Sequence, residues 1–350
     1  MLVWSSPASA GYTPPVGGAA APSGAGPQPS IVARRRSRHQ ANVVPTAYIT
    51  HPSFLLHDMG PHHPECPDRL RAIGDRLISA QVDGHLVHHT APAAGNETLA
   101  RVHSRDYIAT IEAESPASGL HYLDPDTAMN AHSLTAARHA AGAVVLATDL
   151  VMRGDCRTAF CAVRPPGHHA ERRRAMGFCL FNNVAVGAAH ALSVHGIERV
   201  AIVDFDVHHG NGTEDIFSDD PRVLMVSTFQ YPLYPYSGVD NPAPNMVNIP
   251  LPGGAGSGEF RAAVTDHWLP ALERHRPQLI FVSAGFDAHR EDPLAGLELA
   301  DADYAWVTRE LMAVAAKHAQ GRIVSTLEGG YSLSALGRSA ALHIRELVTG

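Results

Sequence analysis

Six short runs of apolar residues, separated by helical patterns, constrain the fold of this chain more than any other feature of its sequence. The runs are almost wholly apolar rather than alternating, which is typical of strands buried on both faces of a parallel sheet. They cover residues 46–50, 158–163, 199–206, 222–229, 278–287 and 322–330. Helical patterns at residues 134–152, 183–196, 260–275 and 302–319 lie between them. This alternation predicts an α/β domain whose mainly parallel sheet is covered by helices on both faces.

The first 44 residues differ in composition from the rest of the chain. They are rich in Ala, Gly, Pro and Ser, they include the arginine-bearing segment ARRRSRHQ, and the first acidic residue of the chain is Asp58. Such a segment cannot bury enough apolar surface to offset its conformational entropy. The acid-poor composition would also fit a transit peptide, but no amphipathic pattern and no apolar signal core is visible. We therefore expect a disordered tail over residues 1–44 and one folded domain over residues 45–350.

Charge, hydropathy and cysteine spacing argue against several classes of protein. A net charge of -7 argues against a dedicated nucleic-acid binder, because phosphate contacts need a basic surface. No apolar run approaches the roughly 20 residues that span a bilayer, and the four cysteines have no CxxC spacing. We expect a reduced, cytoplasmic protein that binds neither nucleic acid nor membrane. No sequence feature indicates its oligomeric state.

Ionisable side chains gather where four of the predicted strands end. The motifs RPPGHHA, DVHHGNG, GFDAH and EGGY stand at the carboxyl ends of the runs that begin at residues 158, 199, 278 and 322. Open parallel sheets place their binding sites outside the carboxyl ends of the strands. We therefore expect the four motifs to form one site.

Carboxylates and an imidazole in these motifs fit a metal site. Asp204, Asp206 and His208 are two residues apart, so on an extended chain their side chains leave the same face. Burying such carboxylates is unfavourable unless a cation lies among them. We predict that Asp206, His208 and Asp287 bind Zn²⁺ or Fe²⁺ and leave an open position for water or substrate. Each aspartate alone would more simply be a helix cap, but the combination favours a metal.

The histidine pair of RPPGHHA predicts proton transfer. His168 and His169 follow a strand and a stiff turn, and Asp204 and Asn211 are nearby acceptors that could hold their second ring nitrogens. Tyr331, at another strand end, could donate a hydrogen bond to an oxyanion, although alone it fits an ordinary tyrosine at a rim. The sequence contains no GxxxxGK[ST] and no GxSxG motif, so nucleotide binding and a serine triad have little support.

Five motifs in one order resemble the histone deacetylase superfamily. RPPGHHA, GFCLFNN, VDFDVHHGNGT, SAGFDAHREDPLAGL and LEGGYS are most similar to its class II-type branch, which includes bacterial histone deacetylase-like amidohydrolases. HDMGPHHPECPDRL, at residues 57–70, resembles the N-terminal motif of that branch, so the similarity covers residues 46–350. The resemblance implies a three-layer arginase/deacetylase-type fold, with a mainly parallel sheet of about eight strands flanked by helices.

The resemblance also implies a role for each matching residue of the site. It assigns zinc to the same three ligands that the motifs predict. His169, paired with Asn211, would be the main general base and acid, and His168, paired with Asp204, would act electrostatically. Tyr331 would polarise the amide carbonyl of the substrate.

A narrow substrate channel and a second cation follow from the same resemblance. The channel would be formed by Gly177, Phe178, Tyr234 and Leu294, with Arg69 near an inner, acetate-release end. A structural monovalent cation, K⁺, would be bound by the Asp204 carboxylate, the Ser227 hydroxyl and the backbone carbonyls of Asp206, His208 and Thr228.

Two positions depart from patterns known in the superfamily. Arg105 aligns with a rim aspartate that grips the substrate backbone in class I enzymes, so a grip on a peptide backbone is in doubt. Leu294 stands where some polyamine-preferring relatives have an acidic gatekeeper, which weakens the case for an acetylpolyamine substrate.

The leading hypothesis is a zinc-dependent amide hydrolase that removes acetyl or other acyl groups from acetyl-lysine or similar N-acetyl alkylamines. An acetylpolyamine or another small amide is the alternative substrate. An arginase-type ureohydrolase would need further aspartates for two manganese ions, and a second D-x-D arrangement is lacking. A silent binder of acetylated ligands would be favoured by loss of a metal ligand or of Tyr331, and the chain keeps them all.

Overall fold

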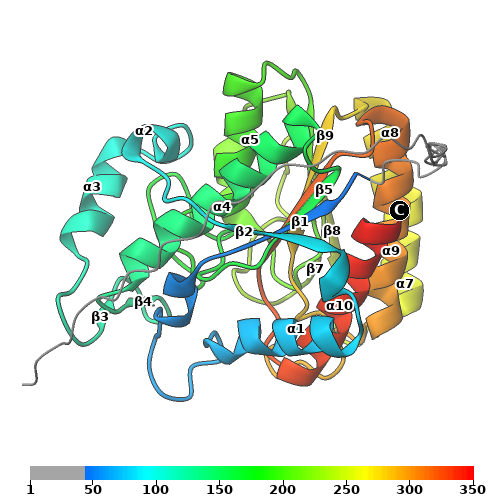
Figure 1. Ribbon diagram of the computed structural model, residues 1–350. Coiled ribbons are helices and arrows are strands. Elements are labelled where there is room, and N and C mark those ends of the chain that lie inside the picture. The colour runs from blue at the N-terminus through cyan, green and yellow to red at the C-terminus, as the bar shows by residue number, and fades with distance from the viewer. Residues whose placement is uncertain (1–43) are drawn as a thin grey trace, which may run out of the picture. The chain divides into compact units, whose positions relative to one another are not determined.

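A sheet of eight parallel strands lies at the centre of the computed structural model, which describes residues 44–350 (Figure 1). The strand order is β2-β1-β5-β10-β9-β6-β7-β8, and each neighbouring pair is parallel. The strands are β1 (Thr46–Thr50), β2 (Leu86–Thr90), β5 (Thr158–Cys161), β6 (Val200–Asp204), β7 (Val223–Gln230), β8 (Met246–Leu251), β9 (Leu279–Ala284) and β10 (Ile323–Leu327). A short hairpin of β3 (His121–Tyr122) and β4 (Ala128–Met129) lies outside the sheet. The predicted tail lies outside the described residues, apart from Val44.

Helices cover both faces of this sheet (Figure 1). Helices α4 and α5 pack on one face, and α1, α7, α8, α9 and α10 lie on the other. The helices are α1 (Asp68–Ser79), α2 (Asn96–Leu99), α3 (Arg105–Ala113), α4 (Ser133–Arg153), α5 (Asn183–Val194), α6 (Asn211–Phe217), α7 (Ser257–Ala263), α8 (Leu269–His275), α9 (Asp301–His318) and α10 (Leu333–Thr349). A π-helical turn, Val264–Trp268, joins α7 to α8. The predicted three-layer α/β fold with a mainly parallel sheet of eight strands is confirmed.

The sequence of the central strands explains both their burial and the position of the site. Strands β6, β9 and β10 are buried along their whole length, as expected for apolar strands that helices cover on both sides. The four strands that carry the polar motifs, in the order β5-β10-β9-β6, are consecutive neighbours in the sheet. Their carboxyl ends therefore lie side by side at one edge, as the motif positions predict.

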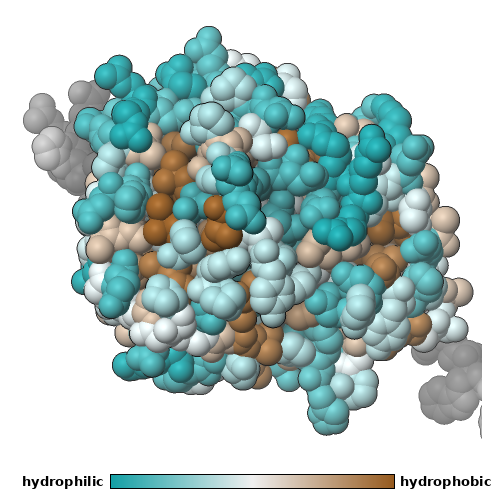
Figure 2. All heavy atoms as spheres, turned by 180° about the vertical axis from the view of Figure 1, so that it is seen from behind, coloured by the Kyte–Doolittle hydropathy of each residue, from teal (hydrophilic) through white to brown (hydrophobic). Residues whose placement is uncertain are grey.

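Helix α4 corrects the expectation that no apolar segment is long enough to span a membrane. Within residues 44–350 it is the one helix whose length and composition pass that test. Its most apolar window is 61% buried, and it packs against β1, β5, β10 and α5, so α4 is a core helix of the domain. Figure 2 shows one face of the molecule, on which apolar side chains form small groups separated by hydrophilic ones.

Candidate active site

The predicted metal ligands lie together at the carboxyl ends of β6 and β9. His208 Nδ1 is 3.0 Å from Asp206 Oδ1 and 3.3 Å from Asp287 Oδ2. The other carboxylate oxygens accept backbone hydrogen bonds, Asp206 Oδ2 from Gly329 N at 2.8 Å and Asp287 Oδ1 from Val207 N at 2.9 Å. Backbone donors thus fix both carboxylates, and each directs one oxygen toward His208.

Two glycines allow the backbone to approach these carboxylates. A Cβ atom added to Gly285 would lie 2.1 Å from Asp206 Oδ2, and one added to Gly329 would lie 1.8 Å from Asp287 Oδ2. Both distances are far below van der Waals contact, so no other residue fits at either position without a shift. This close approach explains why glycine stands in both the GFDAH and the EGGY motif.

The charge balance of this cluster fits a divalent cation. Burial, and then the negative charge of Asp206, raise the pKa of Asp287 to about 7, and Asp287 Oδ2 is buried with no hydrogen bond beyond its 3.3 Å contact with His208 Nδ1. An oxygen in that state is stabilised by a cation that contacts it directly. Two carboxylates and one imidazole are a donor set that zinc accepts, with a position left open. The residues therefore fit the metal that the motifs predict.

A second group of possible ligands, on α4 and at the end of α5, does not share this charge balance. His190 Nε2 and His195 Nε2 both lie against Asp149 Oδ1, at 2.8 and 2.7 Å. Arg101 Nη1 donates to His190 Nδ1 at 3.0 Å, which leaves the hydrogen of that ring on Nε2, facing Asp149. These hydrogen bonds satisfy the group as it stands, and the guanidinium nearby is unfavourable for a cation.

His168 and His169 lie beside the metal cluster, with their rings 4.0 Å apart between centroids. His168 Nδ1 donates to Asp204 Oδ2 at 2.9 Å, and His169 Nδ1 lies 2.8 Å from Asn211 Oδ1. Both pairs join the residues that the sequence predicts. One partner is a carboxylate and the other a neutral amide, so the two imidazoles differ in charge environment.

The pKa shifts of the two histidines have opposite directions. Burial lowers the pKa of His168, but the negative charges of Asp206 and Asp204 outweigh it and hold that pKa well above its usual range. Burial, together with the positive neighbours His168 and His208, holds the pKa of His169 well below its usual range. Near neutral pH, His168 is therefore the charged ring and His169 the neutral ring.

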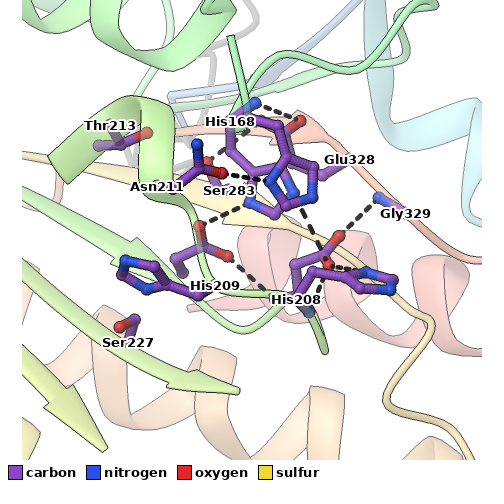
Figure 3. A network of polar contacts seen from close by, with 12 residues as sticks. His168, His208, His209, Asn211, Thr213, Ser227, Ser283, Glu328 and Gly329 are labelled. Atoms are coloured by element: carbon purple, nitrogen blue, oxygen red, sulfur yellow. Dashed lines mark hydrogen bonds and ion pairs between the residues drawn. The ribbon is translucent and has the colours of Figure 1, made fainter. Parts of the chain in front are cut away.

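Glu328 is a site residue that the sequence analysis missed. Its Oε2 accepts hydrogen bonds from the backbone N–H groups of Gly167 and His168, at 2.6 and 3.1 Å. Figure 3 shows Glu328 close to His168. Its Oε1 accepts from the Ser283 hydroxyl at 3.1 Å. Glu328 thus ties the histidine loop after β5 to the ends of β9 and β10. Its position directly before the two glycines of the EGGY motif was the only feature of the sequence that could have indicated a role in the site.

A cavity of about 220 Å³ reaches His169 and is lined by the residues predicted to form the channel walls. Its lining is Asp126, His169, Gly177, Phe178, His208, Leu233, Tyr234, Leu294 and Tyr331. His169 and Gly177 are buried, whereas Leu294 is exposed, so the cavity runs from an apolar rim to the histidines. A Cβ atom on Gly177 would lie 2.4 Å from the His169 ring, which explains the glycine at that wall.

Tyr331 lines this cavity, and two residues hold it from behind. Asp292 Oδ2 accepts hydrogen bonds from the backbone N–H groups of Tyr331 and Ser332, at 2.7 and 3.2 Å. Arg69 is fully buried, donates to the Gly330 carbonyl at 2.7 Å and lies 5.0 Å from the Tyr331 ring centroid. Arg69 is therefore not a lining residue of the cavity, but lies behind its tyrosine. Asp292 was not predicted.

At the rim of the cavity, the structure does not place Arg105, the residue that aligns with the substrate-gripping aspartate of class I enzymes. The Arg105 side chain is largely exposed on α3 and forms an ion pair with Glu97 at 2.7 Å, away from the cavity. Asp126, which the sequence analysis did not single out, is a lining residue instead. Burial, and then the neighbouring Asp124, raise the pKa of Asp126. The cavity thus has the Asp126 carboxylate in its wall, and Arg105 does not line it.

The residues predicted for a monovalent cation lie on β7 and at or just beyond the end of its neighbour β6. Asp204 at the end of β6 is directly opposite Ser227 of β7 in the sheet register, and Thr228 follows Ser227. Asp204 Oδ1 accepts from the backbone N–H of Asp206 at 3.0 Å, and the Ser227 hydroxyl donates to Asn248 Oδ1 at 3.2 Å. Asp204 and Ser227 are brought together, and the full ligand set and its use as a cation site remain a prediction.

The fold and the site together define an α/β protein whose parallel eight-stranded sheet brings a carboxylate–histidine centre to the carboxyl ends of its strands. The chain matches the model of the histone deacetylase domain over residues 63–347. It therefore belongs to the histone deacetylase family, whose members include deacetylases and amidohydrolases that act on amides.

Similar proteins span bacteria and eukaryotes. The chain is 38% identical over 311 residues to a histone deacetylase-like amidohydrolase of Pseudomonas aeruginosa, covering 82% of each protein. It is 36% identical over 307 residues to the polyamine deacetylase HDAC10 of Mus musculus, covering 81% of this chain and 45% of that protein. Among solved structures, the crystal structure of the HDA15 HD domain matches with a TM-score of 0.81 and 36% identity, covering 87% of this chain and 88% of that one.

Proposed function

We propose that this chain is a zinc-dependent hydrolase that removes acetyl groups from acetyl-lysine or similar N-acetyl alkylamines. The observation that supports this most strongly is that His169, His208 and Tyr331 line one cavity of about 220 Å³. A proton acceptor, a metal ligand and a phenol donor are the groups that amide hydrolysis needs around one carbonyl. The chain offers all three to the same bound group.

The shape of the cavity supports a linear alkyl substrate. Phe178 and Tyr234 provide aromatic walls, and the Phe178 ring lies edge-on to Tyr331 with 6.0 Å between centroids. An unbranched chain of methylenes fits between such rings and carries its amide toward the histidines. Asp126 can accept a hydrogen bond from an N–H or ammonium group nearer the solvent.

The histidines supply the proton transfers of the proposed reaction. His169 is neutral and Asn211 accepts from its Nδ1, so its Nε2 can accept the proton of the attacking water. His168, held charged by Asp204, stabilises the negative charge that develops on the amide carbonyl. The Tyr331 hydroxyl donates to the carbonyl oxygen as it becomes an oxyanion. A protonated histidine then gives a proton to the leaving amine, and acetate and a free amine result.

Asp206, His208 and Asp287 would hold the zinc ion. A divalent ion at this site supplies Lewis-acid chemistry, which polarises a carbonyl and lowers the pKa of a water molecule. We also propose K⁺ as a structural ion between β6 and β7. Its role would be to add positive charge on the side of buried Asp204 away from His168, the ring that pairs with Asp204 at 2.9 Å.

Acetate release by the zinc-loaded protein tests the proposed function. An acetyl-lysine peptide and an N-acetylpolyamine are the two substrates, and His169→Gln is the control that removes the proton acceptor. Turnover of the peptide that the variant loses supports the proposal. Absence of acetate from both substrates, with one zinc per chain bound, contradicts it and favours another acyl group or a silent binder.

An acetylpolyamine is the second candidate substrate, and Asp126 favours it. A carboxylate in the wall of the channel can attract the second ammonium group of such a substrate. The similarity to a mouse polyamine deacetylase is in line with this, whereas the apolar Leu294 at the rim supports a lysine substrate. Turnover of the polyamine alone would select this candidate and keep the same chemistry.

A further inference from the structure

The side chain of Asn211 is held on three sides. Its Oδ1 lies 2.8 Å from His169 Nδ1. Its Nδ2 donates to Glu171 Oε1 at 2.8 Å and to Met176 Sδ at 3.3 Å. Both groups that face the amide nitrogen are therefore acceptors, and the stronger of the two is the carboxylate of Glu171.

This arrangement decides which atom of the Asn211 amide faces His169. Rotation of an asparagine side chain can place either its oxygen or its nitrogen at the same position. If Nδ2 faced His169 it would donate to Nδ1, and the neutral ring would then carry its hydrogen on Nε2. Such a ring could not accept a proton on the side of the cavity. With Oδ1 facing His169, the hydrogen sits on Nδ1 and Nε2 is free. The tautomer of His168 does not depend on the orientation of its partner, because both oxygens of Asp204 are acceptors.

Glu171 is itself fixed from the other side. The backbone N–H of Asn182 donates to His103 Nε2 at 2.9 Å, so His103 Nδ1 carries the hydrogen that the Glu171 carbonyl accepts at 3.0 Å. Arg174 donates to Glu171 Oε1 at 2.9 Å. His103 thus holds the backbone of Glu171, and Arg174 holds its carboxylate, so the side chain is not a free surface group.

We propose that Glu171 is a positioning residue that sets the orientation of the Asn211 amide and, through it, the tautomer of His169. This inference rests on the proposed role of His169 as the proton acceptor. Glu171 does not line the cavity, and its direct contact with the catalytic histidine pair is through Asn211.

A double-mutant comparison separates positioning from a general structural effect. Glu171→Leu is expected to lower kcat about tenfold, as for other residues that orient a catalytic or metal-binding histidine, with KM changed less than about twofold. In an Asn211→Asp background the same change is expected to leave kcat unaltered or raise it. Both oxygens of the substituted carboxylate accept, so no orientation is needed, and the neighbouring Glu171 would only repel it.

Glu214→Leu is the matched control for this experiment. Glu214 lies three residues further along α6 and contacts His209 and Asn248, at 2.5 and 3.1 Å, but not Asn211. Its loss is structural, so it is expected to change kcat by the same factor in both backgrounds. If Glu171→Leu behaves like this control, or has no effect on kcat in the parent protein, the positioning role is wrong.

An NMR measurement tests the same inference without activity. With ¹⁵N-labelled histidine, the ring nitrogens of His169 are assigned by their disappearance in His169→Gln. The parent protein is expected to carry the hydrogen on Nδ1, and Glu171→Leu to show a mixture of the two tautomers. An unchanged tautomer in Glu171→Leu would overturn the inference, even if the protein hydrolysed none of the amides tested and the proposed function had failed.

Discussion

At the scale of single residues, the hydroxyl of Tyr331 can be removed without disturbing its ring. Tyr331→Phe keeps the edge-on contact with Phe178 and the contact with Arg69. Burial holds the pKa of Tyr331 well above its usual range, so the hydroxyl remains a donor at every practical pH. We expect kcat to fall by roughly 10²–10³, as when an oxyanion donor is lost, with KM nearly unchanged. Acetate release at saturating substrate measures this, and an unaltered kcat would remove Tyr331 from the chemistry.

Asp126 is expected to affect substrate binding rather than chemistry. Asp126→Asn keeps the shape of the wall but weakens a charge-assisted hydrogen bond to an N–H or ammonium group. A loss near the lower end of the range for such bonds, about 1.5 kcal/mol, corresponds to roughly a tenfold rise in KM. The rise is measured with an acetyl-lysine peptide, with kcat unchanged.

Arg105→Gln is the control for that experiment. Arg105 is the residue that alignment places at the rim, but its side chain pairs with Glu97 away from the cavity. We therefore expect its KM to equal that of the parent protein. A rise in KM for Arg105→Gln but not for Asp126→Asn would show that the two residues have been assigned the wrong way round.

Single residues were predictable from the sequence where one motif contains both the side chain and the strand that carries it. Asp206 and His208 follow β6 directly, so the sheet geometry alone places them at its edge. Asp126 follows the short hairpin strand β3, whose two residues are exposed and give no apolar signal. Asp292 and Glu328 act through backbone N–H groups, of Tyr331 and of His168. A sequence does not show which backbone donors a carboxylate will meet.

At the scale of secondary-structure elements, the buried strands were predictable and the edge strands were not. The six predicted runs correspond to β1, β5, β6, β7, β9 and β10, all of which have a neighbouring strand on each side. Strands β2 and β8 lie at the two edges, and β2 is mostly exposed. Strand β8 contains Pro250, which weakens a strand pattern. Partial exposure removes the continuous apolar run on which the prediction depended.

Helix α10 contains a buried histidine that links acid stability to its packing. His343 is fully buried between α9 and β10, with Nδ1 2.6 Å from the Thr308 hydroxyl and Nε2 2.8 Å from the Ser325 hydroxyl. Burial lowers its pKa to about 3. In the unfolded chain the ring takes up a proton below its ordinary pKa, whereas in the folded protein it does not. The free energy of unfolding should therefore decrease as pH falls from about 6.5 towards 3, by up to about 1.4 kcal/mol per pH unit.

Replacing His343 tests this linkage. Denaturant unfolding at several pH values between 7 and 4 is expected to give a shallower pH dependence for His343→Gln than for the parent protein. Ser325→Ala is the matched control, since it removes a hydrogen bond to the same ring but keeps the titrating group. It should lower stability at pH 7 and retain the steep pH dependence. Equal slopes for all three proteins would contradict the assignment to His343.

At the scale of the whole molecule, one arrangement of strands produces both the apolar core and the pair of buried carboxylates that is energetically least favourable. The order β5-β10-β9-β6 buries the most apolar strands in the middle of the sheet and brings their polar ends to one edge. Asp206 and Asp287 are buried there as neighbours, and Asp287 Oδ2 has no hydrogen bond beyond its 3.3 Å contact with His208 Nδ1. The fold stabilises the domain through its core and leaves these two carboxylates dependent on a cation.

Metal binding should therefore raise the thermal stability of the whole domain. With free zinc at about 100 times its dissociation constant, mass action adds about 2.7 kcal/mol to the free energy of unfolding, which corresponds to a rise in Tm on the order of 5 °C. Scanning calorimetry of chelator-treated and zinc-loaded protein measures the rise. Asp287→Asn should lose it, yet without metal should be at least as stable as the metal-free parent, because one of two adjacent buried charges is gone. If zinc raised the Tm of the variant as much as that of the parent, the ion would be bound elsewhere.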